Sequence, residues 1–171
     1  MNAYHALAAS YDRLTNDVDY EATVEFYMQI LEREGLKPRP CVDLACGTGI
    51  LCEIMHRHGA EAWGMDFSAG MIDIAREGSA AIHYDVADMI TYRPEKQFDL
   101  VTCTGDALNH IAELDDIKKI FENVYAYTAE GGYFIFDILN EKEVSTSEPF
   151  EMDHTETERV WFQMLRPAEN K

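Results

Sequence analysis

Basic residues are scarce in this chain. Its 171 residues include 14 lysines and arginines against 32 aspartates and glutamates, which gives a formal net charge of −18 at pH 7. A surface with this excess of negative charge repels the phosphate backbones of DNA and RNA. We therefore expect no nucleic-acid partner, while the charge remains compatible with a neutral or cationic small molecule.

Long apolar runs and paired cysteines are missing as well. No stretch approaches the roughly 20 apolar residues that cross a bilayer, and residues 1–5 lack the basic start of a secretory signal. The four cysteines show neither a metal-ligand spacing nor the pattern of a secreted disulfide scaffold. We therefore expect a cytoplasmic protein with reduced thiols, no bound metal and no membrane contact.

The chain does contain short apolar stretches that alternate with helical patterns. Stretches suited to strands occupy residues 40–45, 62–66, 81–84, 98–104 and, after the break at Gly131 and Gly132, 133–139. Helical spacing follows possible caps at Asp19, at Ser68 and at Asp115 or Asp116, and also covers residues 50–58. This alternation predicts an α/β fold, a Rossmann-like doubly wound parallel sheet in a three-layer α/β/α arrangement.

A glycine-rich turn follows the first predicted strand. Asp43 stands near the strand's end and Gly47-Thr48-Gly49 opens the next helix, a layout that exposes backbone amides to a nucleotide cofactor. Asp66 ends the second strand, where a carboxylate can accept hydrogen bonds from ribose hydroxyls. A dinucleotide site would have a third glycine where Cys52 stands. The turn therefore predicts a nucleotide-cofactor site without deciding which cofactor.

The wider pattern resembles the class I S-adenosylmethionine-dependent methyltransferases of the small-molecule type. Residues 43–49, Asp-Leu-Ala-Cys-Gly-Thr-Gly, are similar to the family's first motif, and the similarity covers roughly residues 4–140. It continues at 64–68 (Gly-Met-Asp-Phe-Ser), 85–89 (Asp-Val-Ala-Asp-Met), 98–103, 106–110 and the strand ending at Asp137. The resemblance implies S-adenosylmethionine as cofactor and a methyl group as the transferred unit.

The resemblance also implies a role for individual residues. Asp43 would receive the ammonium of the cofactor, Asp66 its ribose hydroxyls, and Asp88 with Met89 the adenine edge. The aromatic ring of Tyr11 would close over the sulfonium. The full set of implied cofactor-binding residues is Tyr11, Asp43, Ala45, Gly47, Gly49, Asp66, Ser68, Met71, Asp88, Met89 and Cys103.

Several of these residues have an ordinary structural alternative. Asp66 could stabilise a helix N-terminus, Asp88 could be a turn residue, and Met71 and Cys103 could be core side chains. His110, just past the fourth strand, is a candidate catalytic base if the acceptor is a hydroxyl. The catalytic residues are otherwise undetermined.

We expect three regions: a helical cap (1–39), a cofactor-binding core (40–140) and an acidic segment (141–171) with the possible start of an antiparallel lid. Family members have seven strands, so the C-terminal strands are incomplete and the chain resembles a copy truncated after the fifth strand. That strand would then be an exposed sheet edge through which a homodimer could form.

Three functions follow from these patterns. The first is methyl transfer from S-adenosylmethionine, with S-adenosylhomocysteine as product, to a small-molecule acceptor by in-line displacement. The second is a non-catalytic module that binds the same cofactor. The third is an NAD-dependent oxidoreductase, which the cysteine at the third glycine position disfavours.

Overall fold

A computed structural model describes residues 18–37, 39–139, 150–154 and 159–162. Tyr11 therefore lies outside the described residues. In chain order the elements are α2 (Tyr20–Arg33), β1 (Pro40–Leu44), α3 (Ile50–Arg57), β2 (Glu61–Asp66), α4 (Ala69–Gly78), β3 (His83–Val86), β4 (Phe98–Cys103), the 3-10 helix η1 (Ala107–His110), α5 (Leu114–Tyr127), β5 (Thr128–Phe136), β6 (Phe150–His154) and β7 (Arg159–Phe162).

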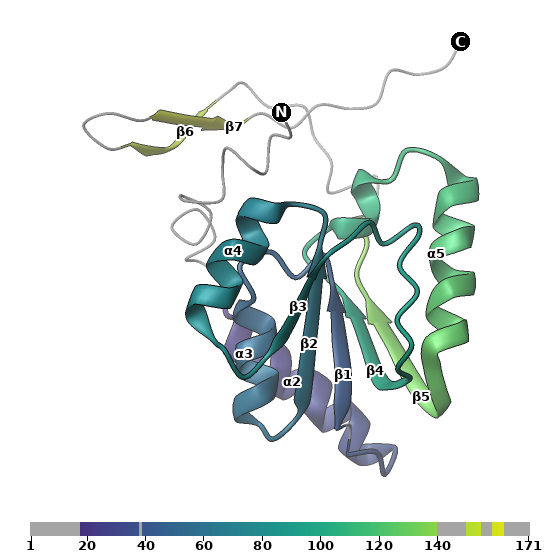
Figure 1. Cartoon of the computed structure of the whole chain (residues 1–171). Coiled ribbons are helices and arrows are strands. Elements are labelled where there is room, and N and C mark those ends of the chain that lie inside the picture. Colours follow the sequence, from purple (N-terminus) through teal and green to yellow (C-terminus); the bar gives the residue numbers. More distant parts are fainter. Residues whose placement is uncertain (1–17, 38, 140–149, 155–158, 163–171) are drawn as a thin grey trace.

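The central sheet is parallel and has the order β3-β2-β1-β4-β5. This confirms the predicted Rossmann-like fold class. The chain runs outward from β1 to β3 and then returns to the other side of β1 at β4, so the order reverses between β1 and β4 (Figure 1). In open parallel sheets, ligands bind outside the carboxyl ends of the strands at this reversal point.

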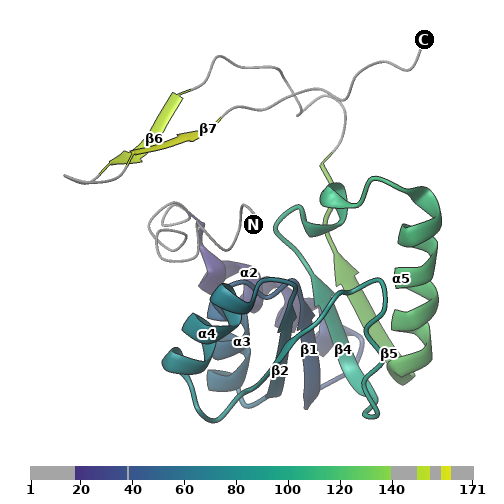
Figure 2. The ribbon, with the colours of Figure 1, turned by 45° about the horizontal axis from the view of Figure 1, so that its top comes forward.

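Helices cover the two faces of the sheet unequally. α2, α3 and α4 lie on one face and α5 lies on the other (Figures 1 and 2). One core cluster joins α2, α3 and α4 to the sheet through buried residues such as Leu31, Met55 and Ile72. The second core cluster joins the opposite face of the sheet to α5 and to the connection between β3 and β4. Tyr92 of this connection is buried in the cluster.

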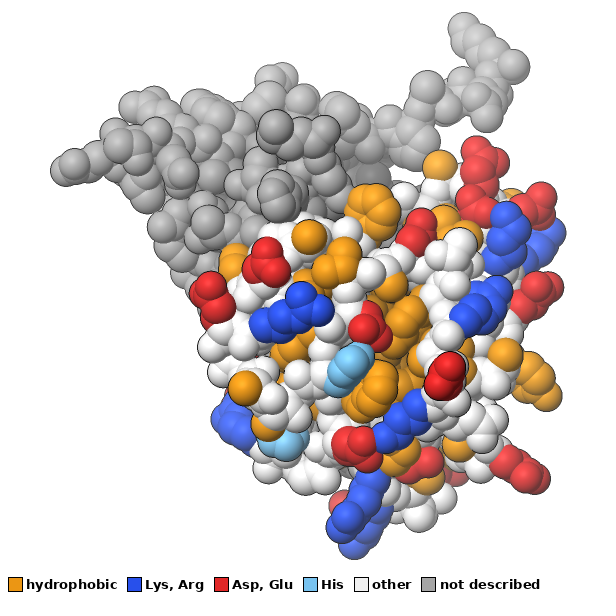
Figure 3. Space-filling model, in the orientation of Figure 1, with side chains coloured by type: hydrophobic (Ala, Val, Ile, Leu, Met, Phe, Trp, Pro, Cys, Tyr) orange, Lys and Arg blue, Asp and Glu red, His pale blue; other side chains and the backbone are white. Residues whose placement is uncertain are grey.

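The connection from β3 to β4 crosses its face of the sheet without a helix. Tyr92 donates a hydrogen bond from its hydroxyl to Asp85 at 3.1 Å, and Asn123 of α5 donates to the carbonyl of Ile90 at 2.9 Å. Figure 3 shows hydrophobic side chains gathered at the centre of the molecular face seen in Figure 1, with charged side chains around them. A loop therefore covers part of this face, and hydrophobic side chains remain at its surface (Figure 3).

Several predicted element boundaries are wrong. β3 covers His83–Val86 and not residues 81–84, and β5 ends at Phe136 and not at residue 139. The N-cap position of α5 is Glu113, because Asp115 and Asp116 lie inside the first turn, where each pairs with the lysine three residues on. β5 begins at Thr128 and runs through the glycine pair. Gly131 has a φ of 79° and the ladder with β4 shifts register nearby. The glycines therefore form an irregularity within the strand, as at a β-bulge.

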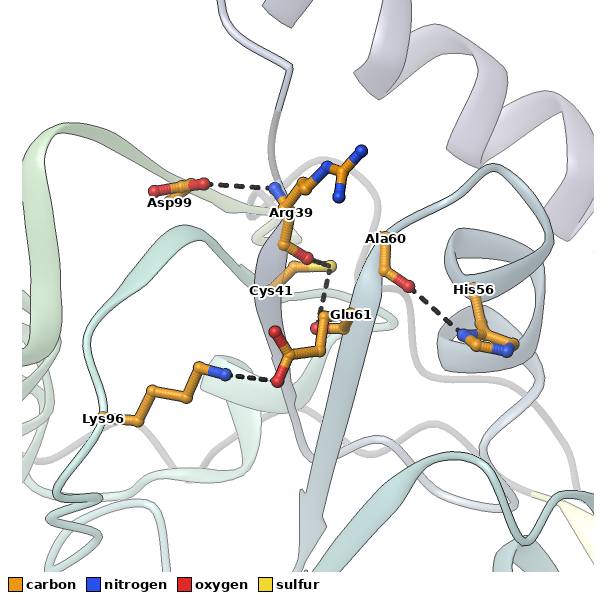
Figure 4. Close-up of polar contacts among 7 residues, drawn as sticks. All are labelled: Arg39, Cys41, His56, Ala60, Glu61, Lys96 and Asp99. Carbon is orange, nitrogen blue, oxygen red and sulfur yellow. Dashed lines mark hydrogen bonds and ion pairs between the residues drawn. The ribbon is translucent and has the colours of Figure 1, made fainter.

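Polar contacts tie the elements together at the amino edge of the sheet (Figure 4). The Arg39 amide donates to the Asp99 carboxylate at 3.1 Å. Lys96 pairs with Glu61 at the start of β2, and a ring nitrogen of His56 lies 3.2 Å from the Ala60 carbonyl. These contacts lie at the edge opposite the carboxyl ends of the strands.

Outside the main sheet, β6 and β7 form an antiparallel pair, in the region where a strand of an antiparallel addition was expected. The division into cap, core and acidic segment stays a prediction, as does a lid role for this pair. Within the described residues, all four cysteines are free thiols and no helix is long and apolar enough to cross a membrane.

Candidate functional site

A cavity of about 340 Å³ opens where the strand order reverses. Its volume lies within the usual range for small-molecule sites. Segments far apart in sequence form its wall: the turn after β1, the ends of β2 and β3, the start of α4, and the loop after β4. The lining residues are Ala45, Gly47, Met65, Asp66, Phe67, Met71, Ala87, Asp88, Met89, Ile90, Thr104, Gly105, Ala107, His110 and Ile111.

Asp66 links the end of β2 to the glycine turn. One carboxylate oxygen accepts a hydrogen bond from the amide of Gly47 at 3.0 Å, and the other accepts one from the amide of Ser68 at 2.7 Å. Burial raises the pKa of the Asp66 carboxyl, and these two hydrogen bonds oppose that rise. Because a carboxylate offers about four acceptor sites, Asp66 retains capacity for ligand hydroxyls at the cavity wall.

The turn after β1 passes through three residues with positive φ: Ala45 (58°), Gly47 (56°) and Gly49 (85°). Ala45 and Gly47 line the cavity, whereas Gly49 does not. A Cβ on Gly49 would lie 2.5 Å from the hydroxyl of Tyr84 and 3.0 Å from Ala75. Gly49 therefore serves the close packing behind the turn.

Cys52, at the third glycine position, is fully buried within α3. Its thiol donates to the carbonyl of Trp63 in β2 at 3.4 Å. The thiol thus fills the space between helix and strand that a dinucleotide site leaves to a glycine.

Asp88, Met89 and Met71 also line the cavity. The Asp88 carboxylate accepts a hydrogen bond from the amide of Ile90 at 2.8 Å. Asp88 is therefore a turn residue, as its structural alternative stated, and it lines the cavity as well. Met71 is only 2% exposed, so it is a core residue that also contributes to the cavity wall.

Asp43, Ser68 and Cys103 do not line the cavity. Asp43 is 4% exposed and accepts a hydrogen bond from the Thr102 hydroxyl at 2.6 Å. Burial raises the pKa of the Asp43 carboxyl to about 7, although the Thr102 hydrogen bond opposes the rise. Ser68 occupies the N-cap position of α4 without a side-chain capping bond, and Cys103 is fully buried.

His110 ends η1 and lines the cavity. Asp106 occupies the N-cap position of η1 with a φ of 63°, and its side chain makes no capping hydrogen bond. His110 therefore stands at the cavity wall, and its role as a catalytic base stays a prediction.

Sequence reasoning missed about half of the cavity wall. Phe67 directly follows Asp66 and is 64% exposed, an unusual exposure for a large aromatic side chain. Its position after the acidic residue was a usable signal. Thr104, Gly105 and Ile111 carry no chemical signature and reach the cavity only because β4 ends beside β1.

The fold and this cavity define a Rossmann-like α/β domain of the type that binds nucleotide cofactors. Residues 41–132, more than half of the chain, match the family described as the methyltransferase domain. The chain belongs to this family, the class I S-adenosylmethionine-dependent methyltransferases.

Individual relatives agree with this assignment. An S-adenosylmethionine-dependent methyltransferase from Clostridium acetobutylicum superposes with a TM-score of 0.80 at 30% identity, over 95% of this chain and 69% of that protein. A protein named as a methyltransferase in Geobacillus sp. is 28% identical over 88% of this chain and 60% of its own length. The ubiquinone biosynthesis O-methyltransferase of Coxiella burnetii is 31% identical over 61% of this chain and 45% of its own length. The chain thus spans about half to two thirds of these relatives.

Proposed function

We propose that this chain is an S-adenosylmethionine-dependent methyltransferase that acts on a small-molecule acceptor. The observation that carries the proposal is the placement of Asp66 and Asp88 on the wall of one cavity at the reversal point of the sheet. Among the described residues, the cavity wall includes no lysine or arginine, and its ionisable side chains are Asp66, Asp88 and His110. Such a wall suits a cationic nucleoside better than one that carries a pyrophosphate.

The described residues suit the separate groups of this cofactor: its ribose, its adenine and its ammonium. Asp66, held by two backbone amides, has acceptor capacity left for the ribose hydroxyls. Met71 and Phe67 supply apolar surface for the adenine, and Asp88 with Met89 would bind its edge. Asp43 lies behind the turn and would act on the ammonium through its charge or a bridging water.

When bound, the cofactor would supply a methyl group on a positively charged sulfur. The cavity wall would orient the acceptor in line with that group and exclude water. If the acceptor is a hydroxyl, a ring nitrogen of His110 would take its proton, whereas a neutral amine needs no base. A small acceptor agrees with the name of the Coxiella relative, a ubiquinone biosynthesis O-methyltransferase.

A cytoplasmic location and the absence of a nucleic-acid partner belong to the same proposal. The net charge of −18 supports the second point, because it opposes approach to a polyanion.

The test is calorimetric titration of the chain with S-adenosylmethionine, S-adenosylhomocysteine and NAD. We expect micromolar binding of the first two, and a loss of about 100-fold in affinity for Asp66→Ala, since a charge-assisted pair of hydrogen bonds is lost. Asp66→Asn keeps one acceptor oxygen and should lose less. Asp73→Ala, an exposed aspartate on α4, is the matched control and should bind normally.

The outcomes separate the three functions. A folded chain that binds NAD but neither form of the methionine cofactor would overturn the proposal in favour of an oxidoreductase. Binding without methyl transfer to any member of a panel of phenols, amines and carboxylic acids would favour the non-catalytic module.

A further inference from the structure

The loop after β4 is held in place from the neighbouring strand. The Asp137 carboxylate, just past the end of β5, accepts the amide of Gly105 with one oxygen at 2.9 Å and the amide of Asp106 with the other at 3.0 Å. Asp137 is separated from these amides by 32 and 31 residues. One side chain thus fixes two consecutive peptide groups of a distant loop.

These two peptide groups are where the chain turns sharply out of the sheet. Gly105 has a φ of 71° and Asp106 a φ of 63°, and the second value is in the left-handed region that a non-glycine residue adopts at a cost. Successive amides in such a turn point to the same side and form a concave anion-binding group. The carboxylate of Asp137 occupies that position and compensates for the backbone conformation.

Two further contacts hold the same loop. Asn109 and Leu139 exchange hydrogen bonds: the Leu139 amide donates to the Asn109 side-chain oxygen at 3.0 Å, and the Asn109 amide group donates to the Leu139 carbonyl at 3.4 Å. Residues 105–109 are therefore fixed at their turn and at their end.

The loop held in this way is part of the cavity wall. Thr104, Gly105, Ala107 and His110 all line the cavity, and every one lies within or directly beside the segment that these contacts fix. Asp137 itself does not line the cavity and is exposed. Its carboxylate therefore affects the site through the shape of the loop.

We propose that Asp137 is a positioning residue, which holds the loop 104–110 in the shape that binds the cofactor and presents His110. This inference rests on the proposed function, because it assigns the loop's shape to the binding of that cofactor. Removal of the carboxylate frees two amides and the strained turn at once, so the wall loses its fixed shape while the sheet remains intact.

The experiment compares Asp137→Ala, Asp137→Asn and Asp99→Ala with the unaltered chain. Asp99 is a matched control, because its carboxylate also accepts a backbone amide, that of Arg39, but at the opposite edge of the sheet (Figure 4). The measurements are the Kd for S-adenosylhomocysteine by calorimetry, the melting temperature, and amide hydrogen exchange at Gly105 and Asp106 by NMR without ligand.

We expect Asp137→Ala to raise the Kd about tenfold and to speed exchange at both amides by a similar factor. Asp137→Asn keeps one acceptor oxygen, so its affinity for S-adenosylhomocysteine should lie between those of Asp137→Ala and the unaltered chain. This variant also tests the proposal if Asp137→Ala does not fold. Asp99→Ala should lower the melting temperature without a change in Kd. An exposed side chain with a merely structural role would not produce this contrast.

Two negative results remain distinguishable. If the unaltered chain binds S-adenosylhomocysteine and both Asp137 variants bind it equally well, the positioning role is overturned and the proposed function stands. If the unaltered, folded chain does not bind it, the proposed function is overturned, and the inference with it.

Discussion

At the scale of single residues, burial decides how each carboxylate behaves. Asp66 and Asp88 line the cavity, while Asp43, with almost no exposure, lies behind it with the Thr102 hydroxyl as partner. One hydroxyl does not replace the water that an ionised carboxylate loses on burial. The pKa of Asp43 is therefore raised to about 7, and ionisation of this group opposes folding.

The first residue-scale prediction concerns the pH dependence of stability. Since the pKa of Asp43 is about 7 in the folded state and about 4 in an unfolded chain, only the folded state holds this proton between those values. The free energy of unfolding should therefore fall as pH rises from about 4 to 7. Asp43→Asn cannot ionise at this position, so its free energy of unfolding should fall by about 3 kcal/mol less over this pH range.

Urea denaturation at several values of pH across this window measures the effect. Asp73→Asn is the control, because Asp73 is exposed on α4 and should leave the pH profile unchanged. A profile of Asp43→Asn that parallels the unaltered chain would contradict a raised pKa for Asp43.

At the scale of elements, the glycine turn and β3 depend on each other. The turn places Gly49 at the start of α3 with a φ of 85°, and the buried ring of Tyr84 from β3 occupies the space beside it. Helix α3 can approach the sheet only because Gly49 has no side chain. The motif thus carries a packing requirement in addition to its role at the cavity.

The element-scale prediction compares three substitutions with the same backbone cost. Gly35→Ala and Gly59→Ala place a Cβ at positive φ in open space and should each destabilise the fold by about 1 kcal/mol. Gly49→Ala adds a clash with Tyr84 and should cost about 3 kcal/mol. Thermal or urea unfolding measures all three.

A double-mutant cycle identifies the cause of the extra loss. Tyr84→Phe removes the hydroxyl that lies nearest the added Cβ, so Gly49→Ala should cost less in that background. Equal losses for Gly49→Ala and Gly59→Ala would show that the backbone conformation alone matters.

At the scale of the whole molecule, the sheet has two edge strands among the described residues, β3 and β5, and each of them pairs on one side alone. β5 pairs with β4, and hydrophobic side chains near it are exposed, among them Phe136 (40%) and Ile138 (63%). An open strand edge favours association. The net charge of −18 opposes it, because two copies repel each other.

The whole-molecule prediction is a salt-dependent homodimer through β5. Raising the salt concentration from about 0.05 to 0.5 M shortens the screening length and should increase the dimer fraction in sedimentation velocity. Phe136→Lys, on the strand, should shift the chain toward monomer. Tyr125→Lys, on the exposed surface of α5, is the control. A monomer at every salt and protein concentration would contradict the proposal.

Much of the fold follows from local sequence. Apolar runs of strand length, helical spacing and the Asp19 cap are set by residues within a few positions of one another, because side-chain direction repeats with the backbone. The α/β class and the glycine turn were therefore predictable. The start of β5 was not, because a glycine pair is compatible with both a break and a bulge until β4 supplies the register.

The sequence by itself determined the family, the order of the elements and which residue types stand at the strand ends. Only the tertiary structure decided that Asp66 and Asp88 face the cavity, that Asp43 is buried and that Asp137 holds the Gly105 turn. The physical reason is the range of the interactions. Steric and periodic preferences act between near neighbours in the chain, whereas burial and cross-strand hydrogen bonds join residues that only the packed sheet brings together.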